Sequence, residues 1–323
     1  MPNDSERNQS PLILKSRVPS NVRNQPLLDY LVARFPYHDR DHWAAEVRAG
    51  RLQVDARTAK VHDQVGAGTE LAYTRNHQEP FVDDRIGVLH DDEALVVVDK
   101  PAHLPMHADG PFVRSTLIHL LRERLAAPDL SLVHRLDRET SGVCVLARTD
   151  PARTSLHAQF EQSRVQKSYL AVVRGRAEHD FVVDTPIGRA RDSRITLRRA
   201  AGERADAPRP ARTRFAVLAH GPNATLLRCE PETGRTHQIR VHLESVGLPV
   251  LGDKLYGRPD DDYLAFVKAV KASGDVRTIV TTEPDRQLLH AHSLGLLHPV
   301  SGAATTFTAP TPACFAQWLQ RET

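Results

Sequence analysis

The sequence predicts an α+β fold: a mixed, mainly antiparallel β-sheet flanked by helices, preceded by a small N-terminal α/β module. Short apolar runs typical of strands and helical patterns both occur, but they do not alternate in the strict order of a doubly wound fold. No repeat of fixed period is visible in the chain. Its 323 residues, 40% of them hydrophobic and 26% charged, suit one large globular domain with a small accessory module.

The first 88 residues divide into an arm, a module and a linker. Residues 1–25 are polar and contain three prolines, so we expect a flexible arm that leads to a short strand. Over residues 26–76, helical spacing of Leu27, Leu28 and Leu31 is followed by a second helical stretch, and a strand-like alternation begins at Leu52. Residues 77–88 contain Pro80 and several acids and are predicted to be a linker.

Residues 89–323 are predicted to form the main domain. The run Ala94–Lys100 is rich in β-branched residues and stops at Pro101, as expected for a buried strand. Further strands are predicted at residues 142–147, 167–173, 225–229, 288–297 and 305–308, and helices at residues 115–124, 151–162, 236–245 and 314–320. Gly247 and Pro249 are typical of the end of the helix at 236–245.

The composition argues against several classes of protein. We find no run of about 18 apolar residues, so we expect no membrane segment. Cys144, Cys229 and Cys314 are far apart and lack metal-ligand spacing, which predicts neither a disulfide framework nor a zinc site. A reducing cytoplasm is the expected location.

One segment of the chain is strongly cationic. Residues 188–214 contain nine arginines against three acids, although the net charge of the whole chain is only +3. Arginines at this density suit a phosphate backbone, to which they can form paired hydrogen bonds. The alternative is a solvated, mobile loop.

The stretch His134–Gly142 reads His-Arg-Leu-Asp-Arg-Glu-Thr-Ser-Gly and lies between two apolar segments. A loop held between core elements can fix a reactive side chain, here Asp137. Composition alone also allows a plain turn, in which Asp137, Thr140 and Ser141 cap backbone groups.

As a motif, His134–Gly142 matches the signature of the RluA-type pseudouridine synthase family at every fixed position. Three further segments follow in the order of that family: Lys167–Val173 with Gly175, Thr233–His242, and Gly252–Gly257. The resemblance covers roughly residues 90–310. Residues 26–74 resemble the S4 RNA-binding module, although residues 54–56 depart from its usual asparagine-glycine turn.

This resemblance implies the pseudouridine synthase fold and an isomerase that converts specific uridines of structured RNA, either 23S ribosomal RNA or transfer RNA, into pseudouridine. The reaction breaks the bond between ribose C1′ and uracil N1 and joins C1′ to C5, so it needs no cofactor and no metal. The target base must leave its stack to be reached. RNA is therefore the expected partner, and we infer no obligatory protein partner and a monomer.

The resemblance also implies roles for individual residues. Asp137 is the catalytic carboxylate, and Arg240 is its ion-pair partner; the alternatives are a surface pair of Arg240 with Glu244, and Arg235 as the partner. Tyr169 is expected to stack on the uracil and handle a proton, or else to be an ordinary core tyrosine.

The remaining candidates are RNA contacts. Arg135 is expected to fill the space that the extruded base leaves, with an ion pair to Asp137 or Asp99 as the alternative. Lys100 borders the RNA groove or extends its amine to solvent. The other candidates are His134, Arg235, His237, Gln238, Arg48 and Arg51. His237 and His242 are five positions apart, which is not the i, i+4 spacing of zinc-binding helices, and no acid lies between them in the required place. His290 and His292 lack a recognisable third ligand, so no metal site is predicted.

Overall fold

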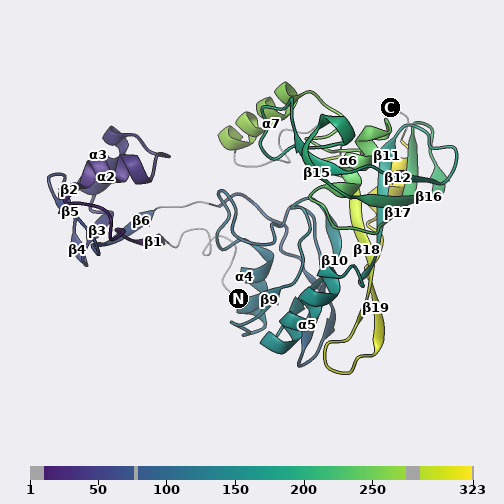
Figure 1. Ribbon diagram of the computed structural model, residues 1–323, viewed down its shortest axis with the longest axis horizontal. Coiled ribbons are helices and arrows are strands. Elements are labelled where there is room, and N and C mark those ends of the chain that lie inside the picture. The colour runs from purple at the N-terminus through teal and green to yellow at the C-terminus, as the bar shows by residue number, and fades with distance from the viewer. Residues whose placement is uncertain (1–10, 76–78, 274–283, 322–323) are drawn as a thin grey trace. The chain divides into compact units, whose positions relative to one another are not determined.

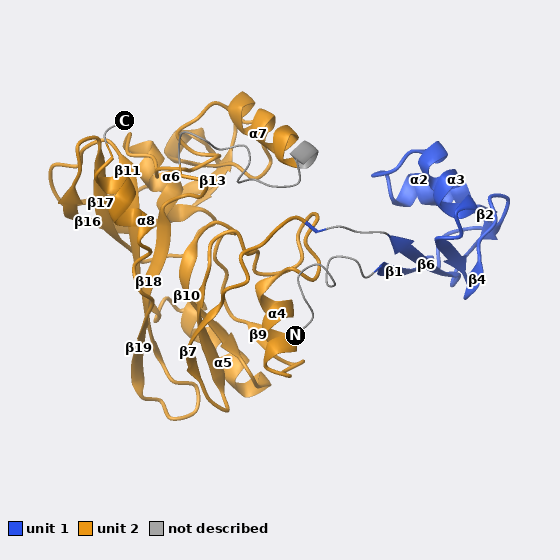
Figure 2. Cartoon of the chain, turned by 180° about the vertical axis from the view of Figure 1, so that it is seen from behind, with its two compact units in different colours: residues 1–79 blue, residues 80–323 orange. Residues whose placement is uncertain are grey.

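The computed structural model describes residues 11–75, 79–273 and 284–321. The chain divides into two compact units, unit 1 (residues 1–79) and unit 2 (residues 80–323), which are coloured separately in Figure 2. Both combine helices with mainly antiparallel sheets, so the predicted fold class is confirmed (Figure 1). None of the helices in the described residues is long and apolar enough to cross a bilayer.

Unit 1 packs two helices against small sheets. Its core includes Leu27, Leu31, Trp43 and Leu52, all essentially inaccessible to solvent. The carboxylate of Asp39 accepts the backbone N–H of His42 and so caps the second helix. The elements are α2 (Leu27–Arg34) and α3 (Arg40–Arg48), a sheet in the order β1 (Leu12–Arg17), β6 (Glu70–Arg75), β3 (Leu52–Val54) and β4 (Arg57–Thr58), and the pair β2 (Gln25–Pro26) and β5 (Gln64–Val65).

The segment predicted as a flexible arm that leads to a short strand contains one strand of unit 1. Residues 12–17 form β1, which pairs with β6 in continuous antiparallel register from Leu12 opposite Arg75 to Arg17 opposite Glu70. The prolines that suggested a flexible arm, Pro11 and Pro19, lie outside the strand, where they remove no ladder hydrogen bond. Residues 1–10 of the predicted arm lie outside the described residues.

Unit 2 is built on one ten-stranded sheet. Its strand order is β12 (Phe181–Asp184), β16 (Arg212–His220), β17 (Ala224–Pro231), β11 (Gln166–Arg174), β18 (Leu289–Leu297), β10 (Ser141–Ala147), β8 (Leu95–Lys100) and β7 (Gly87–Asp91), with β19 (Ala304–Thr308) beside β18 and β9 (Ser131–Leu132) beside β10. Strand β18, yellow in Figure 1, joins the two halves: it is antiparallel to β11 and parallel to β10.

Helices cover both faces of each half of this sheet, which explains why its strands read as continuous apolar runs. They are α4 (Leu117–Arg124), α5 (Asp150–Glu161), α6 (Gln238–Ser245) and α8 (Cys314–Leu319). Helix α5 packs on Val97 and Val145, whereas α4 packs on the opposite face, on Val96 and Leu146. Helices α6 and α8 cover opposite faces of β11 in the same way.

The parallel contact between β10 and β18 depends on a glycine. Gly142 has φ +111°, and a Cβ atom at this position would lie 2.1 Å from the carbonyl oxygen of Ala291. Because no side chain fits there, the strand that follows the Asp137 loop can approach β18 only with glycine at this position.

The cationic segment is ordered and is not a loop. It contains β13 (Ile187–Ala190), β14 (Arg199–Ala201), the short 3-10 helix η1 (Gly202–Arg204) and β15 (Ala205–Arg209), and the three strands form a separate sheet. Four of its nine arginines form ion pairs with acids: Arg194, Arg198, Arg212 and Arg214. Helix α7 (Asp260–Ser273), which provides partners for Arg194 and Arg198, was not predicted.

Candidate active site

Unit 2 contains a pocket of about 530 Å³, bounded by the Asp137 loop, β11 and the segment that leads into α6. Its wall brings together four predicted site residues that are far apart in the chain, Asp137, Tyr169, His237 and Arg240. Arg135, His134, Arg235 and Gln238 also line it. Arg48 and Arg51 belong to unit 1.

Asp137 forms the ion pair with Arg240 that the sequence predicted. Oδ2 accepts a hydrogen bond from Nη1 of Arg240 at 2.7 Å and one from the Gln287 amide at 3.4 Å. Oδ1 accepts no hydrogen bond from the described part of the chain and lies 3.7 Å from Nε2 of His237. Burial raises the pKa of Asp137, but His237, Arg240 and the hydrogen bonds from Arg240 and Gln287 lower it to about 2. The carboxylate is therefore ionised at neutral pH, with one oxygen held and one open.

Arg240 bridges two carboxylates. It donates to both oxygens of Asp253, at 2.6 and 2.8 Å, while its third nitrogen holds Asp137. Asp253 is fixed in turn by the backbone N–H groups of Leu255 and Tyr256, and the Tyr256 ring lies 4.8 Å from the guanidinium carbon. The side chain of Arg240 is only 8% exposed, so this bridge is rigid and largely dry.

Neither alternative partner for these charges is used. Glu244, the possible surface partner of Arg240, pairs with Arg198 instead. Arg235, the other possible partner of Asp137, donates to the carbonyl oxygen of Pro210. Burial and the nearby Arg209 lower the pKa of Arg235. Its place on the pocket wall suits a contact with an anionic ligand.

Helix α6 begins at Gln238, two residues later than predicted. The Gln238 side chain accepts the Thr233 hydroxyl and the Arg235 N–H, which closes a turn before the helix. His237 then adopts the left-handed conformation, with φ 59°. This conformation is costly for a residue with a side chain, and it directs the imidazole into the pocket wall.

Tyr169 lies in β11, packs against both neighbouring core clusters and also lines the pocket. Burial, together with the charge of Asp137, raises the pKa of its hydroxyl. The phenol therefore keeps its proton over the physiological range. Tyr169 is thus part of the core and of the pocket wall, and its stacking on a uracil stays a prediction.

Arg135 is exposed at the pocket rim. Neither of the ion pairs considered for it, with Asp137 or with Asp99, is formed within the described residues. His134 is more constrained: its Nε2 accepts the N–H of Val145 and its ring stacks on Phe160. Arg135 is free to contact a ligand, whereas His134 supports the wall.

Two predicted RNA contacts, Lys100 and Gln238, are wrong, because their polar atoms form hydrogen bonds inside the protein. Lys100 is fully buried, and its ammonium donates to the carbonyl oxygens of Pro101, Leu104 and Arg138. Gln238 uses both amide hydrogens on Arg212 and Thr213 in addition to the two bonds that it accepts. In unit 1, Arg51 forms a paired contact with Glu46, whereas Arg48 is exposed.

Other residues of the site were not predicted. Asp253 and Tyr256 stand in the quoted segment Gly252–Gly257, so a sequence signal existed but gave no role. Lys167 lines the pocket and donates to the carbonyl oxygen of Thr233. Gln287, which donates to Asp137 and Thr140, lies in no motif, and only the tertiary structure reveals it.

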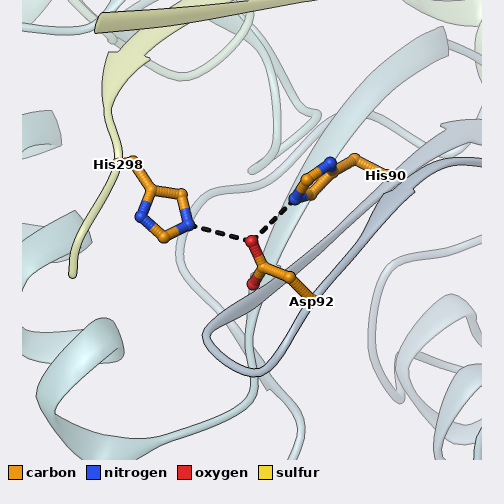
Figure 3. Close-up of side chains that lie close together, drawn as sticks. All are labelled: His90, Asp92 and His298. Atoms are coloured by element: carbon orange, nitrogen blue, oxygen red, sulfur yellow. Dashed lines mark hydrogen bonds and ion pairs between the residues drawn. The ribbon is translucent and has the colours of Figure 1, made fainter. Parts of the chain in front are cut away.

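A separate cluster of His90, Asp92 and His298 has the composition of a metal site (Figure 3). Nε2 of both imidazoles lies within hydrogen-bond distance of Oδ2 of Asp92, at 2.8 and 2.9 Å. Nδ1 of His298, however, accepts the N–H groups of Val300 and Ser301, so its proton is on Nε2 and a metal finds no lone pair there. The cluster is therefore a hydrogen-bonded clamp between the β7–β8 turn and the end of β18.

This clamp predicts a stability effect. Asp92→Asn is expected to lower the free energy of unfolding by about 1–3 kcal/mol at pH 7, because both imidazole donors lose a charged acceptor. Burial raises the pKa of Asp92, but hydrogen bonds from His90, Leu95, Ala94 and His298 lower it below its ordinary value. Its contribution is thus present above the unfolded pKa of about 3.9 and is lost as the pH falls through the lower folded value. Urea unfolding of both proteins at pH 7 and pH 3 measures this, and a zinc-dependent rise in the melting temperature of the wild type alone would identify a metal site instead.

Known proteins resemble this chain in sequence and in fold. The family described as RNA pseudouridylate synthase matches residues 94–245. The ribosomal large subunit pseudouridine synthase D of Nitrosomonas europaea is 35% identical, over 98% of this chain and 89% of its own length. The protein of that name from Xanthomonas campestris is 34% identical, over 95% and 93%. The solved structure of human RNA pseudouridylate synthase domain containing 1 has 27% identity and a TM-score of 0.57, over 73% of this chain and 87% of that one.

The fold and the pocket thus define an RNA-modifying isomerase. The chain belongs to the RluA-type family of RNA pseudouridine synthases, as its motifs predicted, and it converts uridine in RNA into pseudouridine.

Proposed function

We propose that this enzyme modifies large-subunit ribosomal RNA and that Asp137 is the carboxylate that acts at ribose C1′. One observation carries the second part: Asp137 is ionised, its Oδ2 is held by Arg240, and its Oδ1 is open to the pocket. An anionic oxygen that accepts no hydrogen bond from the described residues can attack or stabilise the C1′ centre as the base departs. The choice of RNA rests on relatives that are named for the large ribosomal subunit.

The experiment uses RNA from cells that lack the gene, labelled with tritium at C5 of uridine. We expect the wild-type protein to release tritium from large-subunit ribosomal RNA and Asp137→Asn to release none. Release from transfer RNA alone would move the proposed substrate to transfer RNA. Full activity of Asp137→Asn would refute the role of the carboxylate.

We also propose which residues bind the RNA and where the enzyme works. Arg135 takes the place of the extruded base, and Arg235 contacts a phosphate; both line the pocket, and Arg135 is exposed at its rim. Unit 1 acts as an S4-like module that contacts RNA through exposed Arg48. The protein works as a monomer in the cytoplasm, where its RNA substrate is found and where its three free thiols are stable.

Tyr169 provides a direct prediction. Its ring is expected to stack on the uracil, and its protonated hydroxyl to donate a proton during the reaction. Tyr169→Phe should lower kcat by about 10²-fold with little change in KM, whereas Tyr169→Leu should also raise KM because it loses the stacking surface. Single-turnover tritium release over a range of RNA concentrations separates the two effects. Wild-type activity of the phenylalanine variant would exclude a role for the hydroxyl.

A further inference from the structure

His237 has a strained backbone conformation, and the ion pair between Asp137 and Arg240 does not explain why it is kept. Its φ of 59° lies in the left-handed region, and its side chain is only 7% exposed. Nδ1 lies 2.8 Å from the hydroxyl of Tyr256, and Nε2 lies 3.7 Å from the open oxygen of Asp137. A non-glycine residue is kept in this region when the surrounding structure stabilises it, often at functional sites.

The hydrogen bonds around Tyr256 favour one tautomer of His237. The Tyr256 oxygen accepts the backbone N–H of Arg199 in β14, at 3.1 Å, so its single proton is available for Nδ1 of His237. With Nδ1 as acceptor, the neutral imidazole carries its proton on Nε2. The other tautomer would leave the Tyr256 proton without this partner and turn a lone pair toward the Asp137 carboxylate.

His237 is neutral at neutral pH because it is buried and lies near two arginines. The charged groups around it are Arg240 in α6, Asp137 in the loop before β10, Asp253 in the loop after α6, and Arg199 in β14. Burial and then Arg240 lower the pKa of His237 to about 4, against the opposing effect of the two aspartates. At neutral pH the ring is thus a donor without charge, which leaves the negative charge of Asp137 unpaired on that side.

We propose that His237 donates a hydrogen bond from Nε2 to O2 of the target uracil, and that Tyr256 is the positioning residue that holds His237 in this tautomer. The inference rests on the proposed action of Asp137 at C1′. When the C1′–N1 bond breaks, its electron pair goes to the uracil and spreads to O2 and O4. O2 is the nearer of these to C1′, and so to the open oxygen of Asp137. His237 keeps its proton throughout: the C1′–C5 bond forms, C5 loses its proton, and N1 gains one.

A donor that acts on developing charge must affect kcat. His237→Ala is expected to lower kcat by about 10²–10³-fold with little change in KM, as for the loss of one donor at an oxyanion. His237→Gln, whose amide can donate from a similar position, should regain at least about tenfold. His237→Gly, which suits φ 59° without strain, provides a donor-free control that folds even if the alanine variant does not.

A donor to the ribose 2′-hydroxyl would instead bind the substrate and the transition state equally, and its loss would raise KM. A KM effect alone, an undiminished kcat in both the alanine and glycine variants, or a glutamine variant no better than alanine would each overturn the proposal.

Tyr256→Phe tests the tautomer separately. This variant keeps the ring beside Arg240 but removes the donor to Nδ1 of His237, so the imidazole can carry its proton on Nδ1 and turn a lone pair toward the uracil. We expect Tyr256→Phe to lower kcat by about tenfold or more with little change in KM. In the double variant His237→Gln/Tyr256→Phe, kcat should fall no further than in His237→Gln alone, because glutamine has no tautomer to hold.

An unchanged kcat in Tyr256→Phe, or an equal further loss of kcat in the His237→Gln background, would refute the role of Tyr256. All variants are compared with the wild type on tritium-labelled total cellular RNA. The variants can therefore be compared even where the substrate is an RNA other than ribosomal RNA.

Discussion

Asp137→Asn is expected to lower the rate of pseudouridine formation by at least about 10³-fold while the protein stays folded. Asparagine has nearly the same shape and can still accept the hydrogen bond from Arg240, but it carries no charge to direct at C1′. Arg240 also keeps its paired contact with Asp253, so the guanidinium is not stranded. Single-turnover release of tritium from C5 measures the rate, and thermal unfolding checks the fold.

The matched control is Asp99→Asn. Asp99 is a partly buried carboxylate in β8 and lies outside the pocket. Its neutralisation should leave the rate within a few-fold of the wild type. A comparable loss of activity in both variants would show that the effect of Asp137→Asn is structural.

Arg240→Met is expected to damage both stability and activity. The substitution leaves Asp137 and Asp253 without their shared cation, and breaking a buried pair in this way costs about 3–5 kcal/mol. Burial then raises the pKa of Asp137 without opposition from Arg240, so less of the carboxylate is ionised at a given pH. Activity should fall by about 10²-fold or more at neutral pH and recover in part as the pH rises.

The stability difference has a defined pH dependence. Both aspartates have a folded pKa below the ordinary value, so their stabilisation by Arg240 is present above the unfolded pKa of about 3.9 and is lost as the pH falls through the folded values. The difference between wild type and Arg240→Met should thus be largest at pH 7, smaller near pH 3, and lost only below about pH 2, measured by urea unfolding. Arg124→Met is the control: it breaks the partly buried pair with Asp84 outside the pocket and should lower stability without the change in pH–rate profile.

The sequence predicted the parts of the fold that are apolar and regular. Strands β8, β10 and β11 read as buried runs because helices cover both of their faces. It failed where a structured element has the composition of a loop. Residues 188–214 are rich in arginine and polar residues, yet they form a small sheet because acids of α6 and α7 neutralise some of the arginines and Ile187 and Ile195 join a buried cluster.

The sequence likewise predicted only part of the candidate site. Motifs identified Asp137 and Arg240, which are 103 positions apart, and the need of a buried carboxylate for a cation predicted that they meet. Lys100 was misjudged because a lysine at a strand end usually reaches water, whereas here three carbonyl oxygens receive its ammonium. No sequence pattern marks Gln287, because its contact with Asp137 arises only when the chain folds back to the pocket about 150 positions later.

The central position of β18 constrains the order in which the enzyme can assemble. Ser141 and Gly142 pair with His290 and Ala291, so the two halves of the sheet are joined by a segment that leaves the ribosome about 150 residues after β10. Until then β10 and β11 lack their common neighbour, and Asp137 lacks Gln287. During synthesis the earlier strands therefore expose unpaired edges, which are prone to aggregation, and the half-made chain cannot yet catalyse the reaction. An enzyme that modifies RNA thus becomes active only once β18 has been made.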